Sequence, residues 1–318
     1  MPADYLHNHK QFPELIRIVA EQKDIDPALV EKDYWIMHSL HGLQKLGLTF
    51  ELKGGTSLSK GFKIIDRFSE DIDIHIDPPA DLNVKTGRNQ DKPAHIKSRR
   101  DFYDWLANTK IKIDGIDKVE RDTAFDSDKL FSGGIRLLYK SFTSRIDDLK
   151  DGILLEAGFD VVTPNTEKDI SSWMYDYGAD KVEIIDNRAI DVACYDPGYT
   201  FVEKLQTIST KFRQQQEDRQ FPPNFLRHYY DVDSLLERPE VQTFIGTADY
   251  IAHKDGRFRS LDNKNIAKNE GLYREQSGNE EGIYRDVREN EHSLLRSKAY
   301  IRRDTKEDWR LDRSNVKG

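Results

Sequence analysis

The sequence predicts an α+β protein that combines a mixed sheet and flanking helices with an α-helical C-terminal lobe. Before residue 196, short β-prone apolar segments alternate with segments whose apolar residues recur at helical spacing. After residue 200 only the helical spacing continues. A chain of 318 residues can bury two modest cores. We therefore expect a lobe over residues 1–196 and a helical lobe over residues 197–318.

The first long helix is predicted to begin at Asp26-Pro27 and to end at Gly47. Asp26 is a typical N-cap, and proline is favoured at the first helical position. Five apolar residues form a stripe that predicts packing against the sheet: Val30, Tyr34, Met37, Leu40 and Leu43. On the same helix, Glu31, Lys32 and Asp33 suggest no chemistry by themselves, and a surface cluster would explain them equally well.

A strand, a glycine turn and a helix are predicted next. Phe50 and Leu52 indicate a strand that enters the turn Gly54-Gly55-Thr56-Ser57. Three apolar residues then follow at helical spacing: Leu58, Phe62 and Ile65. This order brings backbone N–H groups and the Ser57 hydroxyl together, where they can hold triphosphate oxygens.

Asp71 and Asp73 lie in a segment whose alternating isoleucines predict a half-buried strand. Residues two apart in a strand share a face, so both carboxylates project together, about 6.5 Å apart along the strand. Magnesium is commonly bound by one or two carboxylates plus substrate phosphates. An isolated Asp-x-Asp is usually a solvated strand face, but the glycine turn upstream favours a nucleotide and metal site.

Between this strand and residue 200 we expect a polar loop over residues 77–93, a helix over 94–109, and strands over 135–139 and 153–159. Glu156 is a carboxylate inside the apolar strand, so it needs a cation, a donor or a cleft edge. A salt bridge to a neighbouring lysine or arginine would also explain it. A hairpin is predicted from residues 182–185 and 189–193 around Asn187.

The C-terminal lobe is predicted to start with a helix from Thr200, whose buried stripe places Lys204 and Lys211 along one flank. Solvated lysines are the ordinary explanation. A second helix with its own buried apolar stripe is expected after Pro222-Pro223-Asn224. Its Arg227 and Asp231 lie four residues apart, where an ion pair would explain both. Residues 255–290 are polar and expected to form a long or partly ordered segment.

Composition limits the classes of function. The net charge of −8 argues against nucleic-acid binding through the whole surface, so an RNA substrate requires a local basic patch. Candidates are residues 97–100 and 296–303, although a solvated helix face is the more common explanation for each segment. The single cysteine, Cys194, excludes an internal disulfide and is expected to be a buried, unreactive thiol. The sequence contains no recognisable signal peptide or membrane-spanning run, which predicts a cytoplasmic protein.

Several of these segments, in this order, resemble the nucleotidyltransferase AbiEii/AbiGii toxin family over roughly residues 28 to 255. They are EKDYWIMHSL, LKGGTSLSKGF, RFSEDIDI, LLEAG, DPGYTFVEKLQTI and RHYYDVDSLL. The resemblance implies a DNA polymerase β-like nucleotidyltransferase fold with a helical C-terminal half. It also implies a bacterial toxin of an abortive-infection or toxin-antitoxin system that transfers nucleotides from an NTP to RNA, with tRNA as the expected acceptor, and is restrained by a separately encoded antitoxin.

The resemblance also implies roles for individual residues. Asp71 and Asp73 would hold Mg²⁺ together with a third carboxylate, either Glu156 or Asp160. The nucleotide would be bound by the glycine turn and the residues after it: Gly54, Gly55, Thr56, Ser57, Lys60, Arg67 and Ser69. Lys204 matches the lysine of the motif Thr200-x-x-Glu203-Lys204 and would neutralise developing charge. In the last motif Asp231 matches the second acidic position while His228 replaces the first, and we favour Asp231.

Two other functions fit the same residues. The donor site would equally serve nucleotidylation of a protein side chain. A module that binds a nucleotide or a partner without catalysis is the alternative outside enzymes, although the presence of both Asp71 and Asp73 argues against it.

Overall fold

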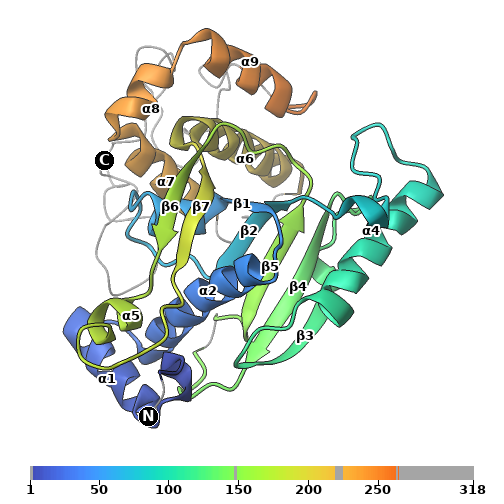
Figure 1. Cartoon of the computed structure of the whole chain (residues 1–318). Coiled ribbons are helices and arrows are strands. Elements are labelled where there is room, and N and C mark those ends of the chain that lie inside the picture. The colour runs from blue at the N-terminus through green and yellow to red at the C-terminus, as the bar shows by residue number, and fades with distance from the viewer. Residues whose placement is uncertain (1–2, 147–148, 219–224, 263, 265–318) are drawn as a thin grey trace. The chain divides into compact units, whose positions relative to one another are not determined.

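The computed structural model describes residues 3–146, 149–218, 225–262 and 264. The chain divides into two compact units, Met1–Tyr195 and Asp196–Gly318. The described part of the first unit contains the sheet with its helices, and that of the second unit is helical (Figure 1). Among the described residues, no helix is both long and apolar enough to cross a membrane.

A mixed sheet of seven strands forms the first unit within the described ranges, with the order β3-β4-β5-β2-β1-β7-β6 (Figure 1). The strands are β1 (Phe50–Lys53), β2 (Asp71–Ile76), β3 (Ile116–Asp122), β4 (Ser132–Tyr139), β5 (Ile153–Gly158), β6 (Asn165–Ile170) and β7 (Ala189–Tyr195). Central strand β2 is antiparallel to β1 and parallel to β5, and β1 is parallel to β7. The predicted α+β class with a mixed sheet is therefore confirmed.

Helices of the first unit occur mainly before and between the strands. The α-helices are α1 (Phe12–Lys23), α2 (Pro27–Lys45), α3 (Gly54–Thr56), α4 (Pro93–Trp105) and α5 (Trp173–Gly178). Short 3-10 turns occur at η1 (Leu6–Asn8), η3 (Ala80–Leu82) and η5 (Thr123–Phe125). Two π-helical turns extend α3 and α4: η2 (Ser57–Gly61) and η4 (Leu106–Lys110). The predicted helix after the glycine turn is shorter than expected, because it ends at Gly61 and leaves Ile65 outside.

One apolar cluster joins the sheet to α1, α2 and α4. The isoleucines of β2, Ile72, Ile74 and Ile76, belong to it and are almost completely buried. The residues that alternate with them in β2, including Asp71 and Asp73, are only half-buried. Since side chains alternate across a strand, the acidic residues lie on the opposite face from the isoleucines, as predicted.

Helix α2 begins where the sequence predicts. Asp26 caps its N-terminus by accepting a hydrogen bond from the Ala28 amide, and Gly47 follows its end with φ +70°. All five stripe residues are fully buried. The helix is buried on most of its circumference, however, because Glu31, Lys32 and Asp33 are also inaccessible. The surface-cluster explanation for these three residues is wrong.

A network of hydrogen-bonded side chains connects α2 to the loops around it. His7 bonds to Asp114 through Nε2 and to the Tyr34 hydroxyl through Nδ1, both at 2.8 Å. Asn187 Nδ2 donates to the Tyr34 oxygen at 3.1 Å and lies 2.8 Å from His38 Nδ1. His38 Nε2 in turn bonds to the Asp114 carbonyl at 2.9 Å. A carbonyl only accepts, so Nε2 of His38 carries the proton and Nδ1 accepts from Asn187.

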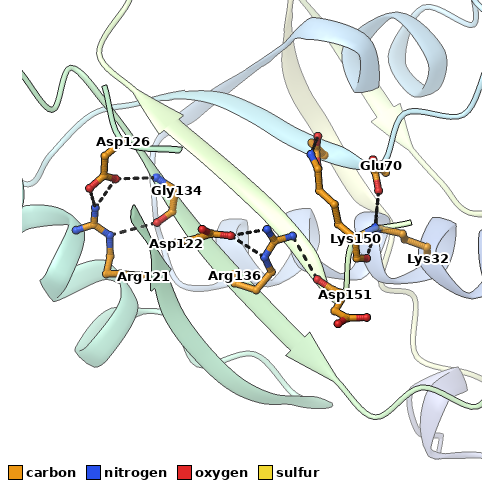
Figure 2. Close-up of polar contacts among 10 residues, drawn as sticks. Lys32, Glu70, Arg121, Asp122, Asp126, Gly134, Arg136, Lys150 and Asp151 are labelled. Carbon is orange, nitrogen blue, oxygen red and sulfur yellow. Dashed lines mark hydrogen bonds and ion pairs between the residues drawn. The ribbon is translucent and has the colours of Figure 1, made fainter. Parts of the chain in front are cut away.

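The predicted hairpin around Asn187 is wrong. Residues 182–185 form no strand, apart from one isolated bridge between Ile184 and Asp4. Strand β7 instead pairs antiparallel with β6. Strand β3 was not predicted from the sequence. Two mostly buried arginines link it to β4 (Figure 2). Arg121 of β3 donates to the Gly134 carbonyl of β4 at 3.2 Å, and Arg136 of β4 forms an ion pair with Asp122 of β3.

The second unit contains four helices within its described residues: α6 (Pro197–Asp218), α7 (Leu226–Leu236), α8 (Pro239–Phe244) and α9 (Ala248–Arg257). The apolar stripes predicted for α6 and α7 are buried. Most of the polar segment 255–290 and the basic residues 296–303 lie outside the described residues.

Candidate active site

The carboxylates of β2 and β5 meet at the centre of the sheet. Register places Glu156 of β5 directly beside Asp73, and Asp73 is paired on its other side with Lys53 of β1. Glu156 is partly buried, and its pKa is raised to about 7 by burial and by the negative charges of Asp73 and Asp71. Burial is the larger cause of this shift, and the charges of the two aspartates add to it.

Asp160, the alternative third carboxylate, lies past the end of β5. It forms a surface ion pair with Arg88, with an N–O distance of 3.7 Å. The geometry therefore favours Glu156 over Asp160 as the partner of Asp71 and Asp73.

The glycine turn packs directly on this carboxylate pair. Gly54 has φ +72°, and a Cβ atom at this position would overlap Oδ2 of Asp73. A Cβ atom on Gly55 would lie 2.5 Å from the Ser69 hydroxyl and 3.0 Å from Nη2 of Arg67. Only glycine permits both this backbone conformation and this close approach. The turn, Asp73, Arg67 and Ser69 are thus in one place, as a nucleotide site would require.

The hydroxyl side chains of the turn, Thr56 and Ser57, are buried inside the fold. Thr56 Oγ1 donates to the Asp71 carbonyl and so ties the turn to β2. Ser57 is fully buried beside the thiol of Cys194, whose pKa burial raises to about 11. Cys194 is therefore buried, as predicted, and its raised pKa disfavours the reactive thiolate. Phosphate contacts at this turn would have to come from its backbone rather than from the Ser57 hydroxyl.

Lys60 is held by α2 and by the segment before α5. Its ammonium forms an ion pair with the fully buried Asp33, donates to the Ser171 carbonyl at 3.1 Å and lies 5.0 Å from the centre of the Trp173 ring. Asp33 also accepts from the Trp173 amide at 2.8 Å. This lysine thus has a structural role that its position in the motif did not predict.

The two other charged residues of the buried α2 segment also bind residues outside the helix. Glu31 accepts hydrogen bonds from the hydroxyls of Ser141 and Thr143 and from the amide of Phe142. Lys32 contacts Glu70, the residue before β2, with an N–O distance of 3.2 Å (Figure 2). These contacts explain how three consecutive charges can be buried without being left unpaired.

Lys150 is a site residue that sequence reasoning missed. Its ammonium forms an ion pair with Asp71 Oδ2, at 2.6 Å. It lies in the connection between β4 and β5, where nothing in the sequence distinguishes it from other polar residues. Only the return of β5 beside β2 brings it to Asp71.

The site offers oxygen ligands suited to magnesium. Oδ1 of Asp71 is buried and has no hydrogen-bond partner within the described ranges, and a buried oxygen without a donor favours a cation. No three histidine, cysteine or carboxylate side chains in that part of the chain already form a metal-binding group. Since magnesium takes only one or two carboxylates plus phosphates and water, the residues fit a cation that binds together with a nucleotide.

In the second unit, Lys204 and Asp231 are joined. Their charged groups lie 2.9 Å apart, with the lysine side chain 13% exposed and Asp231 fully buried. Lys204 is therefore not a solvated lysine. Lys211 is also half-buried, and burial together with the charges of Arg227 and Lys204 lowers its pKa.

The basic segment 97–100 does not form a continuous cationic surface. Arg99 is fully buried and donates to the carbonyls of Lys85, Gln90 and Lys129. Lys97 is exposed and paired with Asp101. This segment therefore provides little of the basic patch expected for an RNA substrate.

Comparison with known proteins gives one family. Residues 39–317 match the model of the family described as nucleotidyl transferase AbiEii toxin, type IV TA system. Among solved structures, the chain is similar to an antigenic nucleotidyltransferase-like protein from Paracoccidioides brasiliensis, with 12% sequence identity and a TM-score of 0.33. That match covers 72% of this chain and 94% of the other. No curated protein matches the sequence.

Proposed function

The chain belongs to the nucleotidyl transferase AbiEii toxin family of type IV toxin-antitoxin systems, and from this we propose that it is a magnesium-dependent enzyme that transfers a nucleoside monophosphate from an NTP to RNA. One observation carries the proposal: the Gly54-Gly55 turn packs on Asp73, with Glu156 beside it and Asp71 on the same face. A backbone cradle for phosphates therefore adjoins a cluster of carboxylates.

Each group of the site has a part in this chemistry. Asp71 and Asp73 would hold the cation, which when bound draws charge from the triphosphate and from the leaving pyrophosphate. The turn's backbone amides, with Arg67 and Ser69, would bind and orient the phosphates. The acceptor hydroxyl oxygen then forms a bond to the α-phosphorus, while the bond between that phosphorus and the bridging oxygen breaks and pyrophosphate leaves.

Glu156 is proposed either to complete the cation site or to accept the proton of the acceptor hydroxyl. A carboxyl group with a pKa of about 7 is partly ionised at neutral pH, which suits a general base. Lys204 would neutralise developing charge, and its contact with Asp231 supports a role for Asp231 in orienting it. No covalent nucleophile is needed, because positioning and electrostatics can supply the catalysis.

The proposed acceptor is RNA, with tRNA as the first candidate, in the cytoplasm of a bacterial cell. The family implies an antitoxin partner. Nucleotidylation of a protein side chain is the second candidate, because the same donor site would serve it.

The test incubates the protein with MgCl₂, each of the four α-labelled NTPs and total tRNA. We expect label in RNA from the wild type and a loss of orders of magnitude in Asp71→Asn and Asp73→Asn, because each loses a cation ligand. Asp160→Asn, which changes a surface carboxylate, is the matched control and should keep wild-type activity. Label in protein instead of RNA would establish the second candidate.

Growth provides an independent readout. Expression of the wild type alone should arrest a bacterial host, whereas Asp71→Asn should not. Equal arrest by both forms would show that toxicity does not require nucleotide transfer, and would favour a binding mechanism. NTP binding without pyrophosphate release would refute the enzymatic proposal.

A further inference from the structure

Lys150 is fixed beside Asp71 by contacts to its own backbone. Glu70 Oε2 accepts from the Lys150 amide at 3.1 Å, and the Lys32 ammonium donates to the Lys150 carbonyl at 2.5 Å. Lys32 and Glu70 also contact each other at 3.2 Å, so three contacts join these residues (Figure 2). The peptide backbone of Lys150 is therefore positioned from both sides, and its side chain extends to Asp71.

This anchor uses a fully buried lysine. Lys32 is 1% exposed, and burial lowers its pKa despite the neighbouring charge of Glu70. Burying an ammonium group is unfavourable unless its hydrogen bonds are satisfied. The bonds that Lys32 makes to Glu70 and to the Lys150 carbonyl satisfy it, so the α2 motif stabilises the position of Lys150.

The Lys150 ammonium lies where a cation is needed. It contacts Oδ2 of Asp71 at 2.6 Å, while Oδ1 of the same carboxylate is buried without a hydrogen-bond partner in the described part of the chain. Asp73 and Glu156 add negative charge to the same face. Without a counter-ion these carboxylates would repel one another. Lys150 supplies one positive charge to that cluster.

We propose that the Lys150 ammonium competes with the divalent cation for Asp71 and thereby sets the cation affinity of the site. This proposal rests on the proposed role of Asp71 as a cation ligand. Binding of Mg²⁺ requires the Lys150 ammonium to leave Asp71 Oδ2 or to share it at the expense of like-charge repulsion. Removal of that ammonium should therefore tighten Mg²⁺ binding in the absence of any nucleotide.

The experiment measures Mg²⁺ binding by isothermal titration calorimetry at constant ionic strength, without NTP. Lys150→Met removes the charge and retains much of the aliphatic chain. Lys150→Gln is a second variant with the same loss of charge, and far-UV circular dichroism checks that each variant is folded. We expect the Mg²⁺ dissociation constant to fall about tenfold in both, a change equivalent to about 1.4 kcal/mol.

Two controls separate competition from a general change of charge. Lys140→Met removes an exposed lysine of the same β4–β5 connection and should leave Mg²⁺ affinity unchanged. Lys150→Arg keeps a positive charge near Asp71 and should retain the affinity of the wild type. Equal or weaker Mg²⁺ binding in both Lys150→Met and Lys150→Gln would overturn the proposal, as would the same tightening in Lys140→Met.

The outcome for Lys150 is separable from that for the proposed function. Tighter Mg²⁺ binding in the charge-removing variants, without label transfer from any NTP by the wild type, would refute the enzyme and retain the competition. Nucleotide transfer by the wild type with unchanged Mg²⁺ affinity in the variants would refute the competition alone.

Discussion

Lys204→Ala should strongly destabilise the C-terminal unit. The substitution removes the ammonium that lies 2.9 Å from the Asp231 carboxylate. Asp231 is fully buried and Lys204 is only 13% exposed, so water cannot replace the lost charge. Breaking one partner of a buried ion pair leaves an uncompensated charge in the interior, which reduces the free energy of unfolding by about 3–5 kcal/mol.

The chain offers a control with the same distance and a different environment. Lys264 and Asp255 also lie 2.9 Å apart, but their side chains are 48% and 62% exposed. Exposed pairs contribute about 0–1 kcal/mol because water and salt screen them. Lys264→Ala should therefore change the free energy of unfolding by less than about 1 kcal/mol. The difference between the stability losses of the two variants measures the effect of burying the ion pair.

Urea unfolding and thermal unfolding, each followed by far-UV circular dichroism, measure the loss of stability in Lys204→Ala. In a domain of about 100 residues, 1 kcal/mol shifts the melting temperature by roughly 4–8 °C, so Lys204→Ala should lower it by about 12 °C or more. The double variant Lys204→Met/Asp231→Leu removes both charges and should lie within about 2 kcal/mol of the wild type. A Lys204→Ala variant as stable as Lys264→Ala would refute the assignment of a desolvated ion pair.

The double variant also separates structure from catalysis. Lys204→Ala alone would lose activity by unfolding even if the lysine had no catalytic role. If Lys204 neutralises charge in the transition state, the stable double variant should lose transfer by about 30- to 1,000-fold. Near-normal transfer by that variant would leave Lys204 with a structural role only. Lys211 is half-buried and beside Lys204, so it is not a suitable control.

Two further predictions follow from the first unit. Gly54→Ala and Gly47→Ala both place a side chain on a backbone with positive φ, so each should reduce the free energy of unfolding by about 1–2 kcal/mol. Only the Cβ atom at position 54 meets Asp73, because a Cβ atom at position 47 has nothing within 4 Å. Nucleotide transfer should therefore fail in Gly54→Ala and persist in Gly47→Ala, and equal activity would contradict the close packing on Asp73. For His38, burial lowers the folded pKa to about 4 from an ordinary 6.5, so the neutral form is favoured on folding. The resulting stability, at most about 3 kcal/mol, is present above pH 6.5 and is lost as the pH falls from 6.5 to 4. Urea unfolding at pH 7 and pH 5 should show this loss in the wild type, and the free energy of unfolding should depend less on pH in His38→Gln. The same pH dependence in both proteins would contradict this prediction.

Local patterns predicted the centre of the sheet well. The alternation of β2 follows directly from its period of two, and the N-cap at Asp26 predicts the beginning of α2. The outer strands were not predictable in this way. β6 is exposed at most of its positions and β3 carries several charged residues, so neither has the apolar signal of a buried strand.

The sequence by itself determined which residues share a face where the spacing is regular: the two carboxylates of β2 and the apolar stripes of α2, α6 and α7. It also determined the glycine turn that precedes β2. Such periodicities depend only on neighbours along the chain. Only the tertiary structure decided the partners of isolated charges. Lys150 meets Asp71, Lys60 meets Asp33, and Lys204 meets Asp231 across 79, 27 and 27 positions of sequence. Burial made these contacts necessary, because a charge removed from water requires a partner that no local pattern specifies.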